Sequence, residues 1–236
     1  MPSVIIDCLQ ESTFRYRTEY VIVVVDVIRA TTTAVTALSS GRRVFPARTS
    51  DEAFVVASTL SNPILAGELG GNMPYGFDMT NSPAQIAERD DTDRPMVLVS
   101  SSGTELIMNS AGSKGVYIAC FRNFSAVADW LSSQQYDRIA VLGAGTRGQF
   151  RREDQMCCGW LAGKLVDTGY EAETPQTREY IYRWKSASPQ EAEKSESADY
   201  LRNSGQLQDL EFVLKHVDDL DIVPKLVNYE LKIINK

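Results

Sequence analysis

The sequence contains a single histidine, only four cysteines and no long apolar run. The lone His216 excludes a site with two histidine ligands in one chain and leaves only one candidate for a Ser-His-Asp triad. The spacing of Cys8, Cys120, Cys157 and Cys158 suits neither a disulfide framework nor a zinc site, so we expect reduced thiols in a cytoplasmic protein. Acid–base or metal chemistry must therefore come mainly from carboxylates, hydroxyls and arginines.

Positive charge is also scarce, because 24 Lys and Arg face 31 Asp and Glu and give a net charge of −7. This balance argues against nucleic acid as a partner, since phosphate backbones require clustered cations. A small anionic substrate stays compatible, because arginines, backbone N–H groups or a bound cation can reverse the field within one cleft. We expect neither a signal peptide nor a membrane span, since no apolar stretch reaches ~18 residues.

Apolar, β-branched segments alternate with helical patterns along the 236 residues. The predicted strands are residues 21–25, 44–47, 64–66, 96–99, 116–119 and 139–142, with a less clear one near 222–227. The predicted helices are residues 51–60, 104–111, 124–133 and 153–167. Alternation predicts a single three-layer α/β/α domain with a mostly parallel or mixed sheet, in which Pro224 would suit only an edge strand. A smaller C-terminal subregion could begin at about residue 170, after which the polar stretch 186–199 is either a solvated helix or a connection.

Small, polar or charged residues follow five of the predicted strands. These segments begin at Asp26, Gly67, Ser100, Cys120 and Gly143. In open parallel sheets, ligands bind in the crevice at the carboxyl ends of the strands. The five segments are therefore expected to converge on one pocket.

The residue types in these segments suit a phosphate ester held by a divalent metal. Magnesium prefers carboxylate oxygens, and the candidate ligands are Asp26, Glu68, Asp78 and Asp154. Loops rich in Gly, Ser and Thr present backbone N–H groups to phosphate oxygens, and Arg29 can grip a phosphate or carboxylate with two hydrogen bonds.

Each feature also has a purely structural interpretation. Asp26 could be a helix cap, and residues 100–104 could form a simple flexible loop. Glu153 and Asp154 stand at an apparent helix start, where acids favour the helix dipole in any case. Residues 143–148 match a dinucleotide-binding fingerprint, but no strand ending in an acid follows ~20 residues later.

Four motifs resemble those of the 2-phosphosulfolactate phosphatases, over about residues 20 to 165. They are Asp26-Val-Ile-Arg-Ala-Thr-Thr-Thr, Gly67-Glu68, Gly76-Phe-Asp78 with Asn81-Ser-Pro83, and Gly143-Ala-Gly with Glu153-Asp154. The resemblance implies a Mg²⁺-dependent hydrolase of the coenzyme M biosynthesis type that releases phosphate and sulfolactate. It places Asp26, Arg29 and two threonines in the catalytic centre, Glu68, Asp78 and Asn81 on a facing loop, and Glu153 and Asp154 at the closure of the site.

We therefore predict Asp26, Arg29 and Asp78 as catalytic residues. The predicted substrate-binding residues are Thr31, Thr32, Asn81, Ser101, Ser102, Gly103, Thr104, Asn123 and Gly145. Attack on phosphorus by water and attack by Asp26 as a covalent nucleophile both remain open, with water favoured because Ile28 breaks an Asp-x-Asp signature.

The substrate and the assembly also remain open. Residues 69–73 are uncharged where family members carry basic side chains, so a different phospho-acid is an alternative substrate. A non-catalytic small-anion binding protein and a nicotinamide enzyme are further alternatives, and a homodimer is compatible with the sequence.

Overall fold

The computed structural model describes residues 1–8, 11–145 and 148–235. The strands are β1 (Ser3–Cys8), β2 (Val21–Val25), β3 (Val44–Ala47), β4 (Ile64–Gly67), β5 (Met96–Val99), β6 (Val116–Ala119), β7 (Arg138–Gly143), β8 (Glu171–Ala172), β9 (Pro224–Val227) and β10 (Glu230–Ile233). The helices are α1 (Ser12–Tyr16), α2 (Ala30–Ser39), α3 (Ser50–Ser58), α4 (Pro83–Ala87), α5 (Gly103–Asn109), α6 (Phe124–Ser133), α7 (Arg152–Asp167), α8 (Pro175–Trp184), the 3₁₀ helix η1 (Pro189–Lys194), α9 (Glu196–Asn203) and α10 (Leu207–Lys215).

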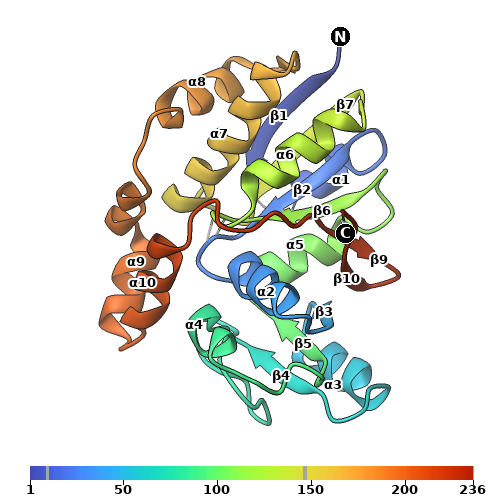
Figure 1. Cartoon of the computed structure of the whole chain (residues 1–236), viewed down its shortest axis with the longest axis vertical. Helices are drawn as coiled ribbons and strands as arrows, with labels where there is room; N and C mark the ends of the chain where they lie inside the picture. Colours follow the sequence, from blue (N-terminus) through green and yellow to red (C-terminus); the bar gives the residue numbers. More distant parts are fainter. Residues whose placement is uncertain (9–10, 146–147, 236) are drawn as a thin grey trace.

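The described strands form one 10-stranded sheet in the order β4-β5-β3-β10-β9-β6-β2-β7-β1-β8 (Figure 1). Strands β3, β4 and β5 form one parallel block, and β6, β2, β7, β1 and β8 form a second. The antiparallel hairpin β9–β10 joins the two blocks. The expected mixed, mostly parallel sheet is therefore confirmed.

One expectation about the sheet is wrong, because β9 is an interior strand and not an edge. Pro224 is the first residue of β9, where a missing N–H is tolerated. The register between β9 and β6 pairs Lys225 with Tyr117, one residue past the proline.

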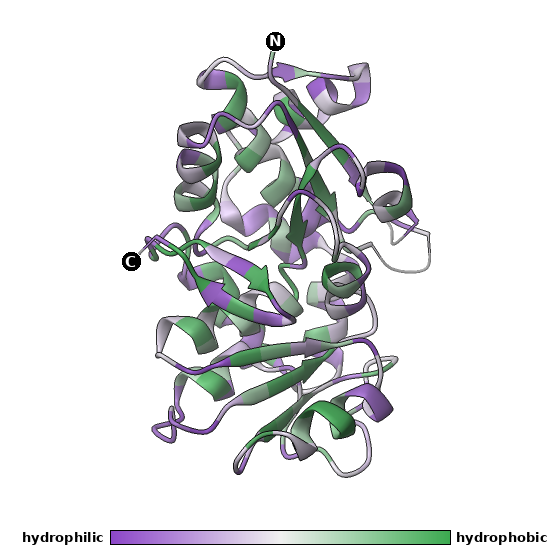
Figure 2. Ribbon diagram, turned by 90° about the vertical axis from the view of Figure 1, so that its right-hand side faces the viewer, coloured by the Kyte–Doolittle hydropathy of each residue, from purple (hydrophilic) through white to green (hydrophobic). Residues whose placement is uncertain are grey.

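Helices cover both faces of the sheet, which gives the predicted three layers. Val21, Val23 and Val25 of β2 pack into one buried cluster, and Ile22 and Val24 pack into another on the opposite face. Burial of β2 on both faces explains its unbroken apolar run. In Figure 2, strands inside the molecule are largely green, the colour of hydrophobic residues.

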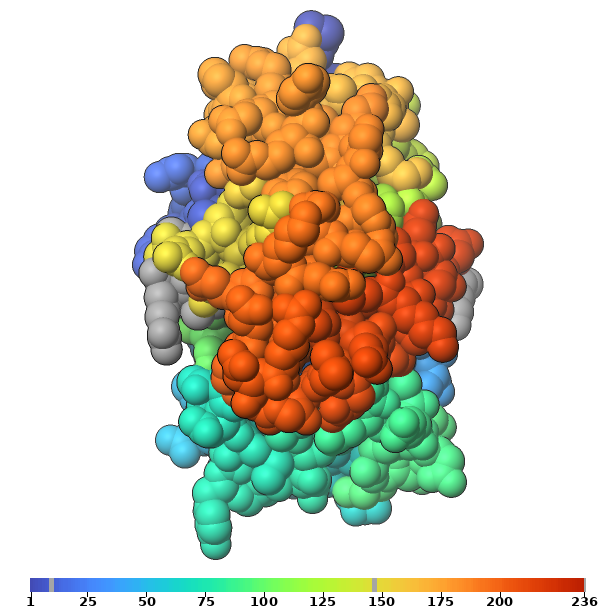
Figure 3. All heavy atoms as spheres, turned by 90° about the vertical axis from the view of Figure 1, so that its left-hand side faces the viewer, coloured from blue at the N-terminus to red at the C-terminus, as the bar shows by residue number. Residues whose placement is uncertain are grey.

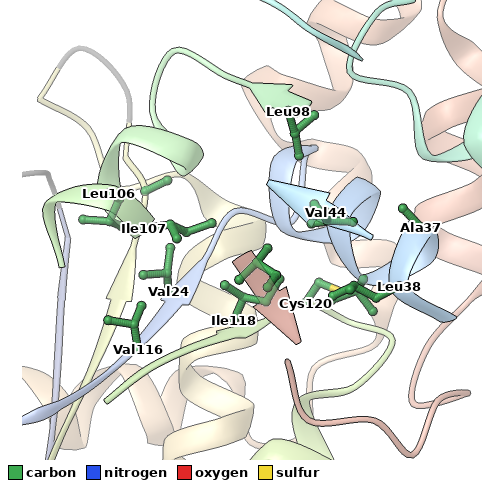
Figure 4. Close-up of a cluster of buried hydrophobic side chains, with 14 of the residues drawn as sticks. Val24, Ala37, Leu38, Val44, Leu98, Leu106, Ile107, Val116, Ile118 and Cys120 are labelled. Atoms are coloured by element: carbon green, nitrogen blue, oxygen red, sulfur yellow. The ribbon is translucent and has the colours of Figure 1, made fainter. Parts of the chain in front are cut away.

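Helices α2 and α5 pack against strands of both parallel blocks. Figure 4 shows the resulting cluster, in which Val24 of β2 and Leu106 of α5 lie near Val44 of β3 and Leu98 of β5. Helices α6 and α7 cover the other face of the second block, and α3 covers the other face of the first. The shared cluster holds the two blocks together on one side.

The predicted strands and helices occur close to their expected bounds, and the 186–199 stretch forms η1 and the start of α9. Strands β1, β8 and β10 had no predicted counterpart. Residues beyond 170 contribute β8, β9 and β10 to the common sheet. All four cysteines are free thiols, and no described helix is both long and apolar enough to cross a bilayer.

Candidate active site

A cavity of about 720 Å³ lies at the carboxyl ends of β2, β4, β5 and β7. Its size suits a small ligand. Four of the five segments that were expected to converge contribute lining residues, among them Asp26, Glu68, Ser101 and Gly145. A further wall comes from α9, through Glu196, Ser197, Tyr200 and Leu201.

Asp26 and Asp154 line this pocket although their side chains are almost withdrawn from solvent, with 7% and 3% of each residue exposed. The Asp154 Oδ1 atom accepts a hydrogen bond of 2.7 Å from the Val27 N–H, and the Asp26 Oδ1 atom accepts one of 3.2 Å from the Ala30 N–H. Both carboxyl groups are therefore held by the backbone of the turn that leads from β2 into α2.

Burial dominates the electrostatics of these acids. The pKa of Asp26 is raised to about 7, first by burial and then by Glu68 and Glu153, whereas the Ala30 N–H bond and Arg29 oppose the rise. The pKa of Asp154 lies well above its ordinary value, first because of burial and then because of Asp26 and Glu153. Burial also raises the pKa of Glu153, while the Ser197 and Ser195 hydroxyls oppose that rise. Asp26, Asp154 and the neighbouring Glu153 therefore repel one another at buried positions that have little contact with water.

The predicted binding residues Thr31 and Thr32 are fully buried and do not line the pocket. The Thr31 hydroxyl donates to the Asp26 carbonyl at 2.7 Å and accepts from the Asp26 N–H at 3.0 Å. The Thr32 hydroxyl donates to the Val27 carbonyl at 2.7 Å. The structure therefore gives both threonines the task of fixing the turn that carries Asp26.

The loop after β5 approaches Asp26 closely at Gly103. A Cβ atom on Gly103 would lie 2.3 Å from the Asp26 Oδ2 atom and 2.7 Å from the Ala30 Cβ atom, so only glycine fits. Thr104 closes the loop by donating its N–H to the Ser100 hydroxyl at 3.0 Å and accepting the Ser100 N–H at 2.8 Å. Gly103 and Thr104 stand behind the pocket wall, which Ser101 and Ser102 supply.

Glu68 connects two walls of the pocket. Its carboxylate accepts the Ser101 N–H and the Gly71 N–H, both at 2.8 Å, and the Ser101 hydroxyl at 3.1 Å. These bonds leave the lone pairs of Glu68 only partly used, since a carboxylate has about four acceptor positions.

Arg29 lines the pocket and is buried, and its Nη1 atom lies 2.5 Å from the Asp209 Oδ2 atom and 2.5 Å from the Gln206 Oε1 atom. Asn81 also lines the pocket, and its buried Oδ1 atom has no hydrogen-bond partner among the described residues. An unsatisfied buried acceptor at a pocket wall is the feature a bound donor or cation would complete.

Two predicted site residues lie elsewhere. Asp78 is exposed and does not line the pocket, and its Oδ2 atom accepts the Leu65 N–H at 2.8 Å. Asn123 accepts the Cys120 N–H at 2.9 Å and donates to the Ile222 carbonyl at 3.2 Å, so it anchors the C-terminal chain to β6.

The contribution of α9 was missed because its sequence indicates only a polar segment. Arg151, just before α7, was also missed, but it could have been found because it is close to the predicted Glu153. Arg151 lines the pocket and pairs with Glu196 of α9. Residues 146 and 147 of the Gly-rich segment lie outside the described residues. His216 is the C-cap residue of α10 and does not line the pocket.

The oxygen atoms on the pocket wall determine whether a cation fits there. In the described part of the chain, no three His, Cys, Asp or Glu side chains are arranged as a ready metal cluster. Mg²⁺ usually needs only one or two protein carboxylates, with waters and substrate oxygens completing its shell. The repelling acids Asp26 and Asp154 and the unpartnered Asn81 oxygen fit such a hard cation chemically.

The sheet and the pocket at its strand ends define an α/β enzyme with an acidic site for a small ligand. A sequence model of the family described as 2-phosphosulpholactate phosphatase matches residues 7–229. The chain belongs to this family and is a hydrolase acting on phosphoric monoesters.

Several relatives carry the description "Probable 2-phosphosulfolactate phosphatase". A protein of Pseudothermotoga lettingae is 33% identical over 214 residues, which cover 89% of this chain and 90% of the relative. One of Caldanaerobacter subterraneus subsp. tengcongensis is 31% identical over 218 residues, or 88% of each chain. One of Symbiobacterium thermophilum is 38% identical over 159 residues, or 65% of this chain and 67% of the relative.

The raised pKa of Asp26 predicts how stability depends on pH without added cation. An unfolded Asp titrates near pH ~4, so between pH ~4 and about 7 the folded protein binds more protons than the unfolded chain, and stability falls as pH rises. D26N removes this penalty. At pH ~8 in EDTA, thermal unfolding followed by circular dichroism should show D26N more stable than the parent by at least about 1 kcal/mol. A variant that is less stable at every pH would contradict the assignment.

The close approach at Gly103 predicts a loss of activity in G103A. The new methyl group would push Asp26 from its place, and misplacement by ~1 Å can cost on the order of 100-fold in rate. G163A is the matched control. Gly163 lies inside α7, and its new Cβ atom would be 3.5 Å from Ile181 Cγ2, which is an ordinary van der Waals contact. It should keep its activity and gain up to about 1 kcal/mol of stability. Equal activities for the two variants would refute the prediction.

Proposed function

We propose that this protein is a Mg²⁺-dependent phosphatase that hydrolyses 2-phosphosulfolactate. The observation that carries the proposal is the pair of buried carboxyl groups, Asp26 and Asp154, on the wall of a small-ligand pocket in a chain of this phosphatase family. Relatives that bear the substrate in their description support the choice of substrate.

Asp26 and Asp154 are the residues that would hold Mg²⁺, with Glu68 on the neighbouring wall. When bound, the ion would supply positive charge to the phosphoryl oxygens and lower the pKa of the attacking water. Asp26 and Asp154 both reach the pocket with part of their acceptor capacity unused, because each makes one backbone hydrogen bond.

Arg29 is proposed to bind the phosphoryl group. Its Nη1 atom is occupied by protein partners, whereas its Nε and Nη2 atoms have no hydrogen-bond partner among the described residues. Arginine suits this task because its planar donors match phosphate oxygens. Ser101, Ser102 and Gly145 line the pocket and would contact the remaining oxygens.

In the favoured route, water attacks phosphorus, one P–O bond forms and the ester P–O bond breaks. The proton lost by the water ends on the hydroxyl of the released acid, so atoms and charges balance. Asp26 would orient the water in this proposal, which is supported by the fixing of its carboxyl group by the Ala30 N–H and by the close approach of Gly103. Attack by Asp26 itself remains the alternative.

The substrate is tested by phosphate release from purified protein. We expect release from 2-phosphosulfolactate in the presence of Mg²⁺, loss of release in EDTA, and recovery when Mg²⁺ is returned. Phospholactate and phosphoglycolate serve as comparison substrates. Release from these alone would keep the phosphatase chemistry and exclude the proposed substrate. No release from any substrate by folded protein would favour the small-anion binding protein.

A pair of conservative variants tests the cation ligands. D26N should weaken Mg²⁺ activation by at least about tenfold together with turnover, because an amide binds a hard cation less well than a carboxylate. D78N should behave like the parent, since Asp78 is exposed on another part of the surface and its Oδ2 atom bonds the Leu65 N–H. Titration of activity against Mg²⁺ measures both. A lost kcat with unchanged Mg²⁺ dependence in D26N would instead favour Asp26 as nucleophile.

A further inference from the structure

Helices α9 and α10 lie across the end of the sheet where the two parallel blocks approach each other (Figure 1). Figure 3 shows residues of about 190–215 as a band between the part formed by α7 and α8 and the part formed by residues 60–90. Tyr200 of α9 contacts the loop after β4, because its hydroxyl donates to the Gly71 carbonyl at 2.6 Å. The C-terminal helices thus contact pocket walls contributed by both blocks.

Asp209 of α10 is the most deeply enclosed acid of this band, with 0% of the residue exposed. Its Oδ2 atom accepts from Arg29 Nη1 at 2.5 Å. Its Oδ1 atom accepts from the Ser82 hydroxyl at 2.5 Å and from the Ala84 N–H at 3.2 Å. This one buried carboxylate therefore connects α10 with the start of α4 and the start of α2.

We propose that Asp209 is a positioning residue that holds the Arg29 guanidinium in its phosphate-binding orientation. The proposal rests on the proposed phosphatase function, because it assigns Asp209 a purpose through Arg29. Asp209 does not line the pocket itself, whereas Arg29 does.

The geometry explains how one contact could set the orientation of Arg29. A guanidinium group is planar, so fixing its Nη1 atom against Asp209 and Gln206 limits the directions of Nε and Nη2. Charge-assisted hydrogen bonds of this kind are strong, and they are stronger where water is excluded. Arg29 pairs with no other carboxylate in the described part of the chain.

D209N tests the proposal with the smallest change of shape. The amide keeps an oxygen that can accept from Ser82 and Ala84, but it removes the charge that faces Arg29. We expect kcat/KM to fall by at least about tenfold and the dissociation constant for inorganic phosphate, measured by calorimetry with Mg²⁺ present, to rise by a similar factor. D209E, which restores the charge on a longer side chain, should recover part of both losses.

D219N is the matched control. Asp219 accepts from Arg122 Nε at 3.0 Å and from Arg122 Nη2 at 2.7 Å. Arg122 is buried and Asp219 is exposed, and neither residue lines the pocket. This variant should lower the melting temperature and leave kcat/KM within about twofold of the parent. If D209N behaves as D219N does, Asp209 has only a structural role and the proposal is overturned.

A double-mutant cycle separates positioning from general stability. In an R29A background, D209N should cause no further loss of phosphate affinity, because the group that Asp209 holds is gone. A full additional loss in that background would overturn the proposal. Phosphate binding also separates the two hypotheses: a parent that hydrolyses no phosphoester refutes the proposed function, while a weaker phosphate affinity in D209N would still support the role of Asp209.

Discussion

The burial of Asp26 and Asp154 in one pocket is the constraint on which the rest of the site depends. Neither acid has an arginine as a hydrogen-bonded partner among the described residues. Asp154 instead accepts the Val27 N–H, and Asp26 accepts the Ala30 N–H. Isolated buried charges are costly, so the surrounding structure must supply enough stability to keep them there. Strand β2 ends directly before Asp26 and is apolar and buried on both faces, so it contributes stability next to the site.

The sheet makes this pocket possible because its two parallel blocks bring their carboxyl ends together. The β9–β10 hairpin at the centre of the sheet separates the blocks, and α2 and α5 pack across both of them. Asn123 and Arg122 at the end of β6 hold the chain that leads to this hairpin, through Ile222 and Asp219. The β6 end therefore serves the assembly of the site and does not line the pocket.

The amino-acid pattern predicted strands β2 to β7 because buried strands follow a local rule. Apolar β-branched runs mark buried strands, and polar residues after parallel strands converge, as Asp26, Glu68 and Ser101 do. The pattern could not separate residues that face the pocket from those that support it, as with Thr31 and Thr32. It also could not place α10, because the contact of Asp209 with Arg29 spans 180 positions in the chain and has no local signature.

The charges around the pocket support the proposed cation. Arg29 pairs with Asp209 and Arg151 pairs with Glu196, so each of these arginines already faces a carboxylate of the protein. Asp26, Glu68 and Asp154 add negative charge at the same walls. A phosphoester would enter an unfavourable field unless positive charge compensated these acids, and the proposed divalent ion would do so while also relieving the repulsion between Asp26 and Asp154. The same repulsion that destabilises the ligand-free protein would thus favour binding of the proposed ion.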